Sequence, residues 1–256
     1  MNRISHTRDL EALLQQTRNL SGFEFAALNW SALDAEDLCE LQFDQCTFEN
    51  NICRDVKFET IRFTDCTFIA CGFDSASTKA TQFDSCVFYD KESERNCSFK
   101  FAQFDDVSFK RCDLTMANFS RANFYRVTLN QCPATGIDLS YASACHQVGN
   151  TVMRGDAWIN DCNMSYADFR GANFNDCDLS SNRLSHSVLD HASFENALLN
   201  DCDFHAVTAD GLSIKGADLR DAQITGLDIR TIDMTGARIN GFQQRTLLEA
   251  IGLIVD

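Results

Sequence analysis

The chain of 256 residues contains one proline, Pro133, and no Cys-x-x-Cys pair among its 13 cysteines. Proline cannot donate to a backbone ladder, so its near absence is compatible with extensive strand pairing. The missing CxxC spacing argues against a zinc site or a disulfide framework. Neither a signal peptide nor an apolar run of transmembrane length is present. With an odd number of thiols, these absences predict a protein of the reducing cytoplasm that has no membrane association.

Basic residues are also scarce, with 22 Lys and Arg against 37 Asp and Glu, which gives a formal net charge of −15. Direct nucleic-acid binding is disfavoured because there is no basic stripe to neutralise phosphates. Two interpretations of the negative charge stay open. It keeps the protein soluble, or it offers DNA-binding proteins a decoy for the phosphate backbone.

Catalytic signatures are absent as well. The chain has no Gly-rich phosphate loop, HExxH, GxSxG or metal-spaced His/Cys cluster. Its Asp residues recur with the repeat described next, so no pair stands out as a general acid and base. We therefore expect a protein that is not an enzyme, with no cofactor and no metal.

What the chain has in abundance is a five-residue repeat. A large apolar residue, position i, recurs every fifth residue, and position i−2 is small. The register runs from Phe23, Leu28, Leu33 and Leu38 to Phe88, resumes at Phe99 and continues through Leu129, and runs again from Phe169 to Ile239. A period of five fits neither a helix nor an open strand. It predicts an all-β square solenoid in which four units close a coil of about 20 residues and both i and i−2 point inward.

Most cysteines follow the same register. Ten of them occupy the small position i−2: Cys46, Cys66, Cys71, Cys86, Cys97, Cys112, Cys132, Cys162, Cys177 and Cys202. A free cysteine behaves as a small buried hydrophobe. We therefore expect stacked core thiols.

The repeat stops near both ends. Thr7–Leu20 has helical spacing, with Leu10, Leu13 and Leu14 on one face, and predicts a helix that caps residues 21–240. Residues 241–256 also adopt helical spacing and end in an apolar tail. The apolar residues there predict a homodimer interface, and the alternative is an end cap folded back on its own coil. The residues are Leu247, Leu248, Ile251, Leu253 and Ile254.

Two interior segments break the register and predict loops that leave the solenoid. The segment 89–96 is too charged for an inner wall. Within 145–156, strict register would point Arg154 into the core without a partner, which is costly. Loops on a rigid scaffold are where function concentrates.

The units resemble those of a known family. Ala117–Arg121 (ANFSR), Ala167–Gly171 (ADFRG) and Ala217–Arg220 (ADLR) match the A(D/N)LxX consensus of pentapeptide-repeat proteins. This resemblance implies a right-handed quadrilateral β-helix. The stretches CVFYDKESERNCSF (86–99), KRCDLTMANF (110–119), MSYADF (164–169), LDIRTIDMTG (227–236) and LLEAIGLIV (247–255) are similar to the Qnr branch. Residues 1–50 and the content of the second loop depart from it.

The Qnr resemblance implies protection of bacterial type II topoisomerases from quinolones, through binding to DNA gyrase and topoisomerase IV. The implied contact residues are Tyr89, Asp90, Lys91, Glu92, Ser93, Glu94 and Arg95 in the first loop, and His146, Gln147, Val148, Asn150, Thr151, Val152, Met153 and Arg154 in the second. Two alternatives remain open. One is self-immunity, in which gyrase is protected from a peptide or natural-product poison, and the other is a structural interaction scaffold.

Overall fold

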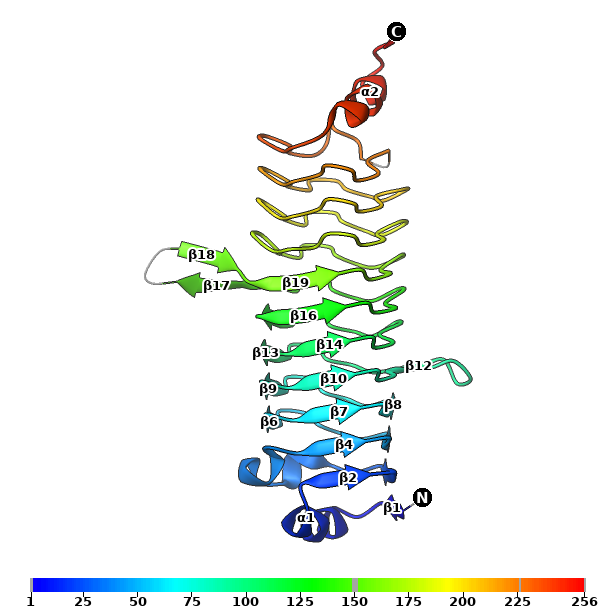
Figure 1. The fold of residues 1–256 in the computed structure, drawn as a ribbon, viewed down its shortest axis with the longest axis vertical. Coiled ribbons are helices and arrows are strands. Elements are labelled where there is room, and N and C mark those ends of the chain that lie inside the picture. Colours follow the sequence, from blue (N-terminus) through cyan, green and yellow to red (C-terminus); the bar gives the residue numbers. More distant parts are fainter. Residues whose placement is uncertain (1, 149–151, 226, 256) are drawn as a thin grey trace.

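The chain winds into a right-handed, four-sided β-helix, which confirms the predicted fold (Figure 1). The computed structural model describes residues 2–148, 152–225 and 227–255. We name the four sides in chain order faces A, B, C and D. Consecutive coils pair in parallel, for example Phe43 with Phe63 and Phe63 with Phe83 on face D. None of the helices in these described ranges has the length and apolarity required to cross a bilayer.

Short strands mark three of the faces. Face D is turned towards the viewer in Figure 1 and consists of β2 (Asn19–Ser21), β4 (Gln42–Asp44), β7 (Arg62–Thr64), β10 (Gln82–Asp84), β14 (Ser108–Lys110), β16 (Val127–Asn130) and β19 (Ala157–Asn160). Face A contains β1 (Asn2–Ile4), β3 (Phe23–Ala26), β5 (Thr47–Glu49) and β8 (Thr67–Ile69). Face C contains β6 (Lys57–Glu59), β9 (Ser77–Lys79), β13 (Gln103–Asp105) and β15 (Asn123–Tyr125).

Face B is joined by single bridges, which link Asn29, Ile52, Gly72, Ser98, Asn118, Asp138, Asp168, Val188 and Thr208 in succession. Single bridges of the same kind continue all four faces towards the C-terminus.

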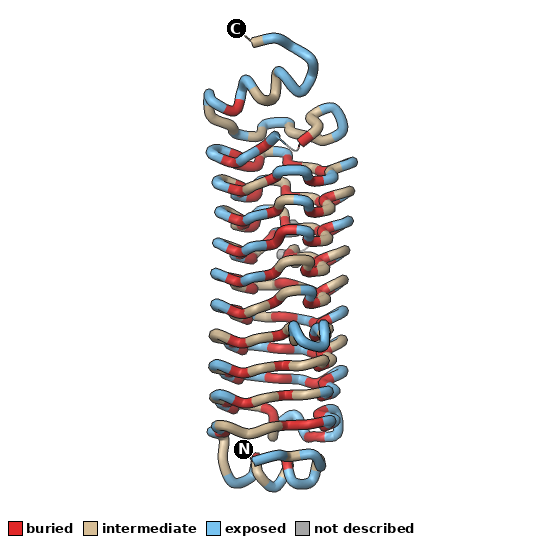
Figure 2. Tube along the Cα trace, turned by 90° about the vertical axis from the view of Figure 1, so that its right-hand side faces the viewer, coloured by how far each residue is buried: buried red, intermediate tan, exposed pale blue. Residues whose placement is uncertain are grey.

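The corner of each unit falls two residues after position i, where the backbone turns with positive φ. Asp65 has φ 51° and Ser181 has φ 60°. This left-handed region favours glycine and short polar residues. The repeat therefore alternates inward apolar residues with tightly turned corners, and this alternation closes the square (Figure 2).

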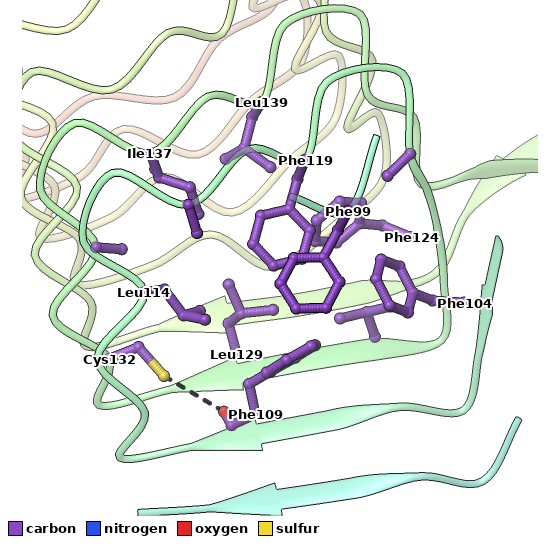
Figure 3. Packing of buried hydrophobic residues seen from close by; sticks show 14 of the residues in the cluster. Phe99, Phe104, Phe109, Leu114, Phe119, Phe124, Leu129, Cys132, Ile137 and Leu139 are labelled. Atoms are coloured by element: carbon purple, nitrogen blue, oxygen red, sulfur yellow. Dashed lines mark hydrogen bonds between the residues drawn. The ribbon is translucent and has the colours of Figure 1, made fainter. Parts of the chain in front are cut away.

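The interior is a dry column of stacked side chains (Figure 3). The rings of Phe43, Phe63 and Phe83 lie almost parallel, with centroids 5.0 and 4.8 Å apart. Offset ring pairs at this separation add to the hydrophobic burial. A charged residue in this column would have no partner.

The thiols form part of this interior, and all thirteen cysteines are free. In successive coils a buried thiol donates to a backbone carbonyl of the coil before it, as Cys132 Sγ does to Phe109 O at 3.5 Å (Figure 3). Burial raises the pKa of Cys177 and of Cys202 to about 12, so these thiols are protonated at neutral pH.

The first coil departs from the predicted register. Leu20 pairs with Phe43, and Phe25 pairs with Phe48. In both pairs the partners are 23 residues apart in the sequence, whereas paired residues of later coils are usually twenty apart. The central inward residue is therefore Phe25, and Phe23 is only half-buried. The Asn29–Ile52 bridge places Leu28 across from Asn51, at a small position, and the Leu28 N–H donates to Asn51 Oδ1 at 3.3 Å. The prediction of Phe23 and Leu28 as position i was wrong.

Two short 3-10 helices, η1 (Trp30–Ala32) and η2 (Ala35–Leu38), occupy the longer first coil. Trp30 is buried and its indole N–H donates to Asn51 Oδ1 at 3.0 Å. This bond satisfies the amide of Asn51, which would otherwise be a costly polar group in the core.

Helices flank both ends of the β-helix. Helix α1 (Thr7–Gln16) buries Leu10 and Leu14 against the first coil. It ends at Gln16, earlier than the sequence suggested, because Leu20 already belongs to β2. At the other end, helix α2 (Gly241–Ala250) follows the last coil.

Candidate interaction surfaces

The first register break is a small antiparallel hairpin. Strands β11 (Tyr89–Asp90) and β12 (Arg95–Asn96) pair between faces A and B. Phe99 stacks on Phe73, which is 26 residues earlier in the sequence. The coil that contains the hairpin is therefore six residues longer than a regular coil of twenty. Its tip, Lys91 to Glu94, is exposed (Figure 2).

Charged side chains fix this hairpin to the coils on both sides of it. Arg95 donates to Asn50 Oδ1 at 3.1 Å and lies 3.4 Å from Glu49 Oε1, two coils back. Lys91 Nζ lies 3.9 Å from Asp113 Oδ2 of the following coil. Within the hairpin, hydrogen bonding from Ser93 lowers the pKa of Asp90. The hairpin is therefore oriented by its own side chains.

The second break is a longer hairpin. Strands β17 (Cys145–Val148) and β18 (Val152–Gly155) pair antiparallel, with His146 opposite Arg154 and Gln147 opposite Met153. Leu129 pairs with Ile159, thirty positions on, so ten residues are extra in this coil. Arg154 is exposed and His146 is half-buried. Asn150 and Thr151, which were also predicted as contacts, lie outside the described residues.

The base of this hairpin is held tightly against the β-helix. A Cβ on Gly155 would lie 1.7 Å from the carbonyl oxygen of Asn175, so only glycine fits there. The His146 ring packs on Tyr125 with centroids 4.2 Å apart. Beside it is a groove of about 500 Å³ lined by His146, Arg154, Gly155, Asp156, Trp158 and Asp176.

The two hairpins leave the rod at diagonally opposite corners. The first follows face A and the second follows face C, and they project to opposite sides in Figure 1. Those predicted contact residues that the structure describes therefore lie in two separate clusters.

The C-terminal helix is fixed to the last coil by polar bonds. Asn240 and Gln243 form a capping box, and the buried Gln243 amide donates to Leu219 O at 2.6 Å and Ala222 O at 2.8 Å. The bond to Ala222 O satisfies a carbonyl that the backbone of a further coil would otherwise bind, whereas Leu219 O also accepts from Ala222 N.

Beyond this attachment the helix and tail expose apolar side chains. Phe242 is 93% exposed and Ile254 is 92% exposed, and Ile251 and Leu253 are each about half exposed. Of the other predicted interface residues, Leu247 packs partly on the core and Leu248 is half-buried. Sequence reasoning missed Phe242, although it is an aromatic residue in the first turn of the C-terminal helix.

Negative charge gathers along the corner between faces D and A. Asp65, Asp161, Asp201 and Asp221 all occupy this corner, are exposed, and form no ion pair with the described residues. Asp228, by contrast, is paired with Arg230, whose hydrogen bonds lower the pKa of Asp228 to about 2. The one basic residue described at this corner, Arg111, is paired with Asp84. The corner between faces D and A is thus an acidic edge.

Comparison with known proteins agrees with this geometry. A family model described as pentapeptide repeats matches eight copies, over residues 95–140, 162–201 and 197–236. A trypsin-treated variant of QnrB1, described as a plasmid-mediated fluoroquinolone resistance protein, superposes with a TM-score of 0.71. It has 27% identity, and the match covers 91% of this chain and 98% of that one. The chain thus contains pentapeptide repeats and resembles the Qnr family.

Two curated Qnr proteins are similar in sequence. The quinolone resistance pentapeptide repeat protein QnrB96 of Scandinavium goeteborgense is 33% identical over 127 residues, which is 50% of this chain and 59% of that protein. The pentapeptide repeat protein QnrB4 of Escherichia coli is 33% identical over 132 residues, 50% of this chain and 61% of that protein. The chain therefore matches about three fifths of the length of these Qnr relatives.

Proposed function

We propose that this Qnr-like protein protects bacterial type II topoisomerases from quinolones, with DNA gyrase as the first target and topoisomerase IV as the second. It acts without catalysis, by binding the enzyme. The observation that carries the proposal is the pair of hairpins, β11–β12 and β17–β18, which project from an otherwise filled rod.

The rigidity of the scaffold supports a role for these hairpins in binding. Their bases are fixed by the Arg95 contacts and by the close approach of Gly155 to Asn175. A hairpin that is ordered before binding loses little conformational entropy on contact with a partner. We propose that the tips contact the enzyme and destabilise its drug-trapped complex with cleaved DNA.

Charge supports a complementary contribution from the rod. The formal net charge is −15, and the acidic edge lines carboxylates along the rod axis. An acidic surface speeds encounter with a DNA-binding enzyme and makes association sensitive to salt. Competition with DNA for the same enzyme surface would follow from this charge.

A supercoiling assay with purified gyrase, titrated with this protein in the presence and absence of ciprofloxacin, tests the proposal. We expect supercoiling to be restored in the presence of the drug at protein concentrations that do not inhibit the drug-free enzyme. Restoration with a peptide or natural-product poison but not with ciprofloxacin would favour self-immunity. The absence of any effect or binding would leave a structural scaffold as the better explanation.

A further inference from the structure

Hairpin β17–β18 rests on two side chains that do not belong to it. The His146 ring of β17 lies on the Tyr125 ring with centroids 4.2 Å apart, and the Arg126 guanidinium lies 5.0 Å from the centre of the same ring. Tyr125 is the last residue of β15, and Arg126 is the corner that follows it. Both therefore belong to the coil before the one that the hairpin leaves.

The rod itself does not require an aromatic residue at position 125. The parallel register places Tyr125 in one outward row with Asp105, Lys79 and Glu59 of the three preceding coils. The inward residue of this unit is Phe124, which is fully buried, whereas Tyr125 is half-buried. Tyr125 thus interrupts a row of charged residues at the coil on which the hairpin rests.

Arg126 joins this contact to the other strand of the hairpin. Its backbone N–H donates to Asp156 O at 2.7 Å, and Asp156 is the residue that directly follows β18. Its side chain is held from the preceding coil, because Nη2 donates to Asp105 Oδ1 at 2.8 Å. Tyr125 therefore contacts the chain where it enters the hairpin, and Arg126 contacts the chain where it returns.

Unfavourable polar burial is concentrated at the same place. Within the described ranges, three buried side-chain nitrogen or oxygen atoms form no hydrogen bond, namely Arg126 Nε, His146 Nδ1 and Thr78 Oγ1. Burying such an atom without a partner costs free energy. Two of the three belong to the side chains that contact the Tyr125 ring. Local features that disfavour the folded state cluster at functional sites, so they point to a role beyond stabilising the rod.

The contact with Tyr125 also fixes one wall of the groove beside the hairpin. His146 lines this groove together with Arg154, Asp156 and Trp158, and it is the cross-strand partner of Arg154. A ring that rests on Tyr125 cannot turn away without losing that contact. The wall is therefore ordered before any partner arrives, and ordered side chains lose little entropy on binding.

We propose that Tyr125 and Arg126 are positioning residues for protection, which orient hairpin β17–β18 for its contact with the topoisomerase. This inference rests on the proposed function and adds to it two residues that lie outside both hairpins. Their effect is exerted through the fraction of molecules whose hairpin has the binding orientation. The apparent affinity for the enzyme falls as that fraction falls.

Four variants test this role. Tyr125→Ser removes the ring, and Tyr125→Phe removes only the hydroxyl group. Arg126→Ser removes the guanidinium and keeps the backbone N–H that bonds to Asp156. Serine is tolerated at such corners, since the chain itself has it at Ser75, Ser85 and Ser181.

The fourth variant, Tyr141→Ser, is the matched control. Tyr141 and Tyr166 are exposed tyrosines at the two corners beside face B, whereas the hairpin follows face C. The Tyr141 ring also lies 4.7 Å from a guanidinium carbon, that of Arg121. The control therefore removes the same kind of ring and the same kind of contact at a distance from the hairpin.

Two measurements are made on each purified full-length variant. Hydrogen exchange followed by mass spectrometry reports the opening of β17 and β18. The supercoiling assay with gyrase and ciprofloxacin gives the protein concentration that restores half of the activity. We expect exchange in Tyr125→Ser to be about tenfold faster, the effect of losing one aromatic contact, and the required concentration to rise about threefold or more.

Arg126→Ser should change both quantities in the same direction and by less. Tyr125→Phe and Tyr141→Ser should behave like the unmodified chain, and the melting temperature of Tyr125→Ser should match that of Tyr141→Ser.

Several results would overturn the inference and leave the proposed function standing. They are unchanged exchange in Tyr125→Ser, protection by Tyr125→Ser at the concentration that the unmodified chain requires, and loss of protection in Tyr125→Phe. A melting temperature of Tyr125→Ser far below that of the control would also overturn it, because Tyr125 would then stabilise the rod as a whole. If the unmodified chain does not protect gyrase, the inference and the proposed function are both overturned.

Discussion

Gly155, at the end of hairpin β17–β18, lies so close to Asn175 that a single methyl group would be 1.7 Å from the Asn175 carbonyl oxygen. Asn175 belongs to the next coil, and its backbone cannot move without disturbing the ladder. The close contact between Gly155 and Asn175 therefore fixes the base of the hairpin, and it is possible only because Gly155 has no side chain.

Gly155→Ala should destabilise the protein by about 1–3 kcal/mol, the usual cost of forcing an extra methyl group into a packed site. Thermal melting should show a decrease of several degrees, and protection should fall because the hairpin is displaced. Gly72→Ala is the matched control, since nothing lies within 4 Å of its Cβ position and its φ is not positive. Equal melting temperatures for the two variants would contradict the close packing.

The hairpins themselves should be dispensable for folding. Deleting Lys91–Arg95, or separately His146–Arg154, should abolish protection in the ciprofloxacin assay and leave the β-type circular dichroism unchanged. The reason is that neither segment supplies an inward residue of the coils. Replacing Lys91–Glu94 with a Gly/Ser segment of equal length distinguishes loss of side chains from loss of length. A collapse of the dichroism signal would mean that the hairpins are structural.

A charge in the aromatic column should unfold the rod. Phe119 is fully buried and stacks on Phe99 with centroids 4.6 Å apart. Phe119→Asp leaves a carboxylate without a partner in a dry interior, at a cost of several kcal/mol. The same holds for Phe174→Asp. Phe119→Leu is the control, because Leu139 occupies the same column one coil later. Unchanged melting of the Asp variant would show that the register is misassigned.

The β-helix could be predicted from the sequence because its core signal is local and repeats. A large residue every fifth position and a small residue two before it specify the inward side of nearly every unit from Phe43 to Leu219. The first coil could not be predicted, because its three extra residues put Leu20 opposite Phe43, the place assigned to Phe23, and Phe25 opposite Phe48, the place assigned to Leu28. Only pairing with the second coil reveals that shift.

The candidate surfaces were harder to predict than the fold. Register breaks indicate that a segment leaves the coil, yet the anchoring of Arg95 on Asn50 joins residues 45 positions apart and leaves no trace in sequence spacing. Tyr141 and Tyr166 occupy ordinary corner positions of the repeat and do not violate it. They become unusual only when exposure and positive φ are known together for Tyr141 and Tyr166.

The C-terminal helix leads to a prediction about assembly. We expect its apolar residues to form a two-fold, self-complementary interface, because Phe242 and Ile254 are almost fully exposed in a single chain. Each large apolar side chain buried there contributes about 1.5–3 kcal/mol. Leu248→Arg with Ile251→Arg would place like charges across the interface. The variant should be monomeric and folded, since each coil depends mainly on its neighbours.

Light scattering combined with size-exclusion chromatography measures this directly. The unmodified protein should have the mass of a dimer, and the Leu248→Arg, Ile251→Arg variant that of a monomer with the same dichroism spectrum. Gln244→Arg with Glu249→Arg is a control that adds positive charge to exposed polar positions of the same helix, and it should remain dimeric. A monomer mass for the unmodified protein would remove the dimer hypothesis. The alternative, a tail that serves only to end the rod, would then be preferred, although it leaves the exposure of Phe242 without a physical reason.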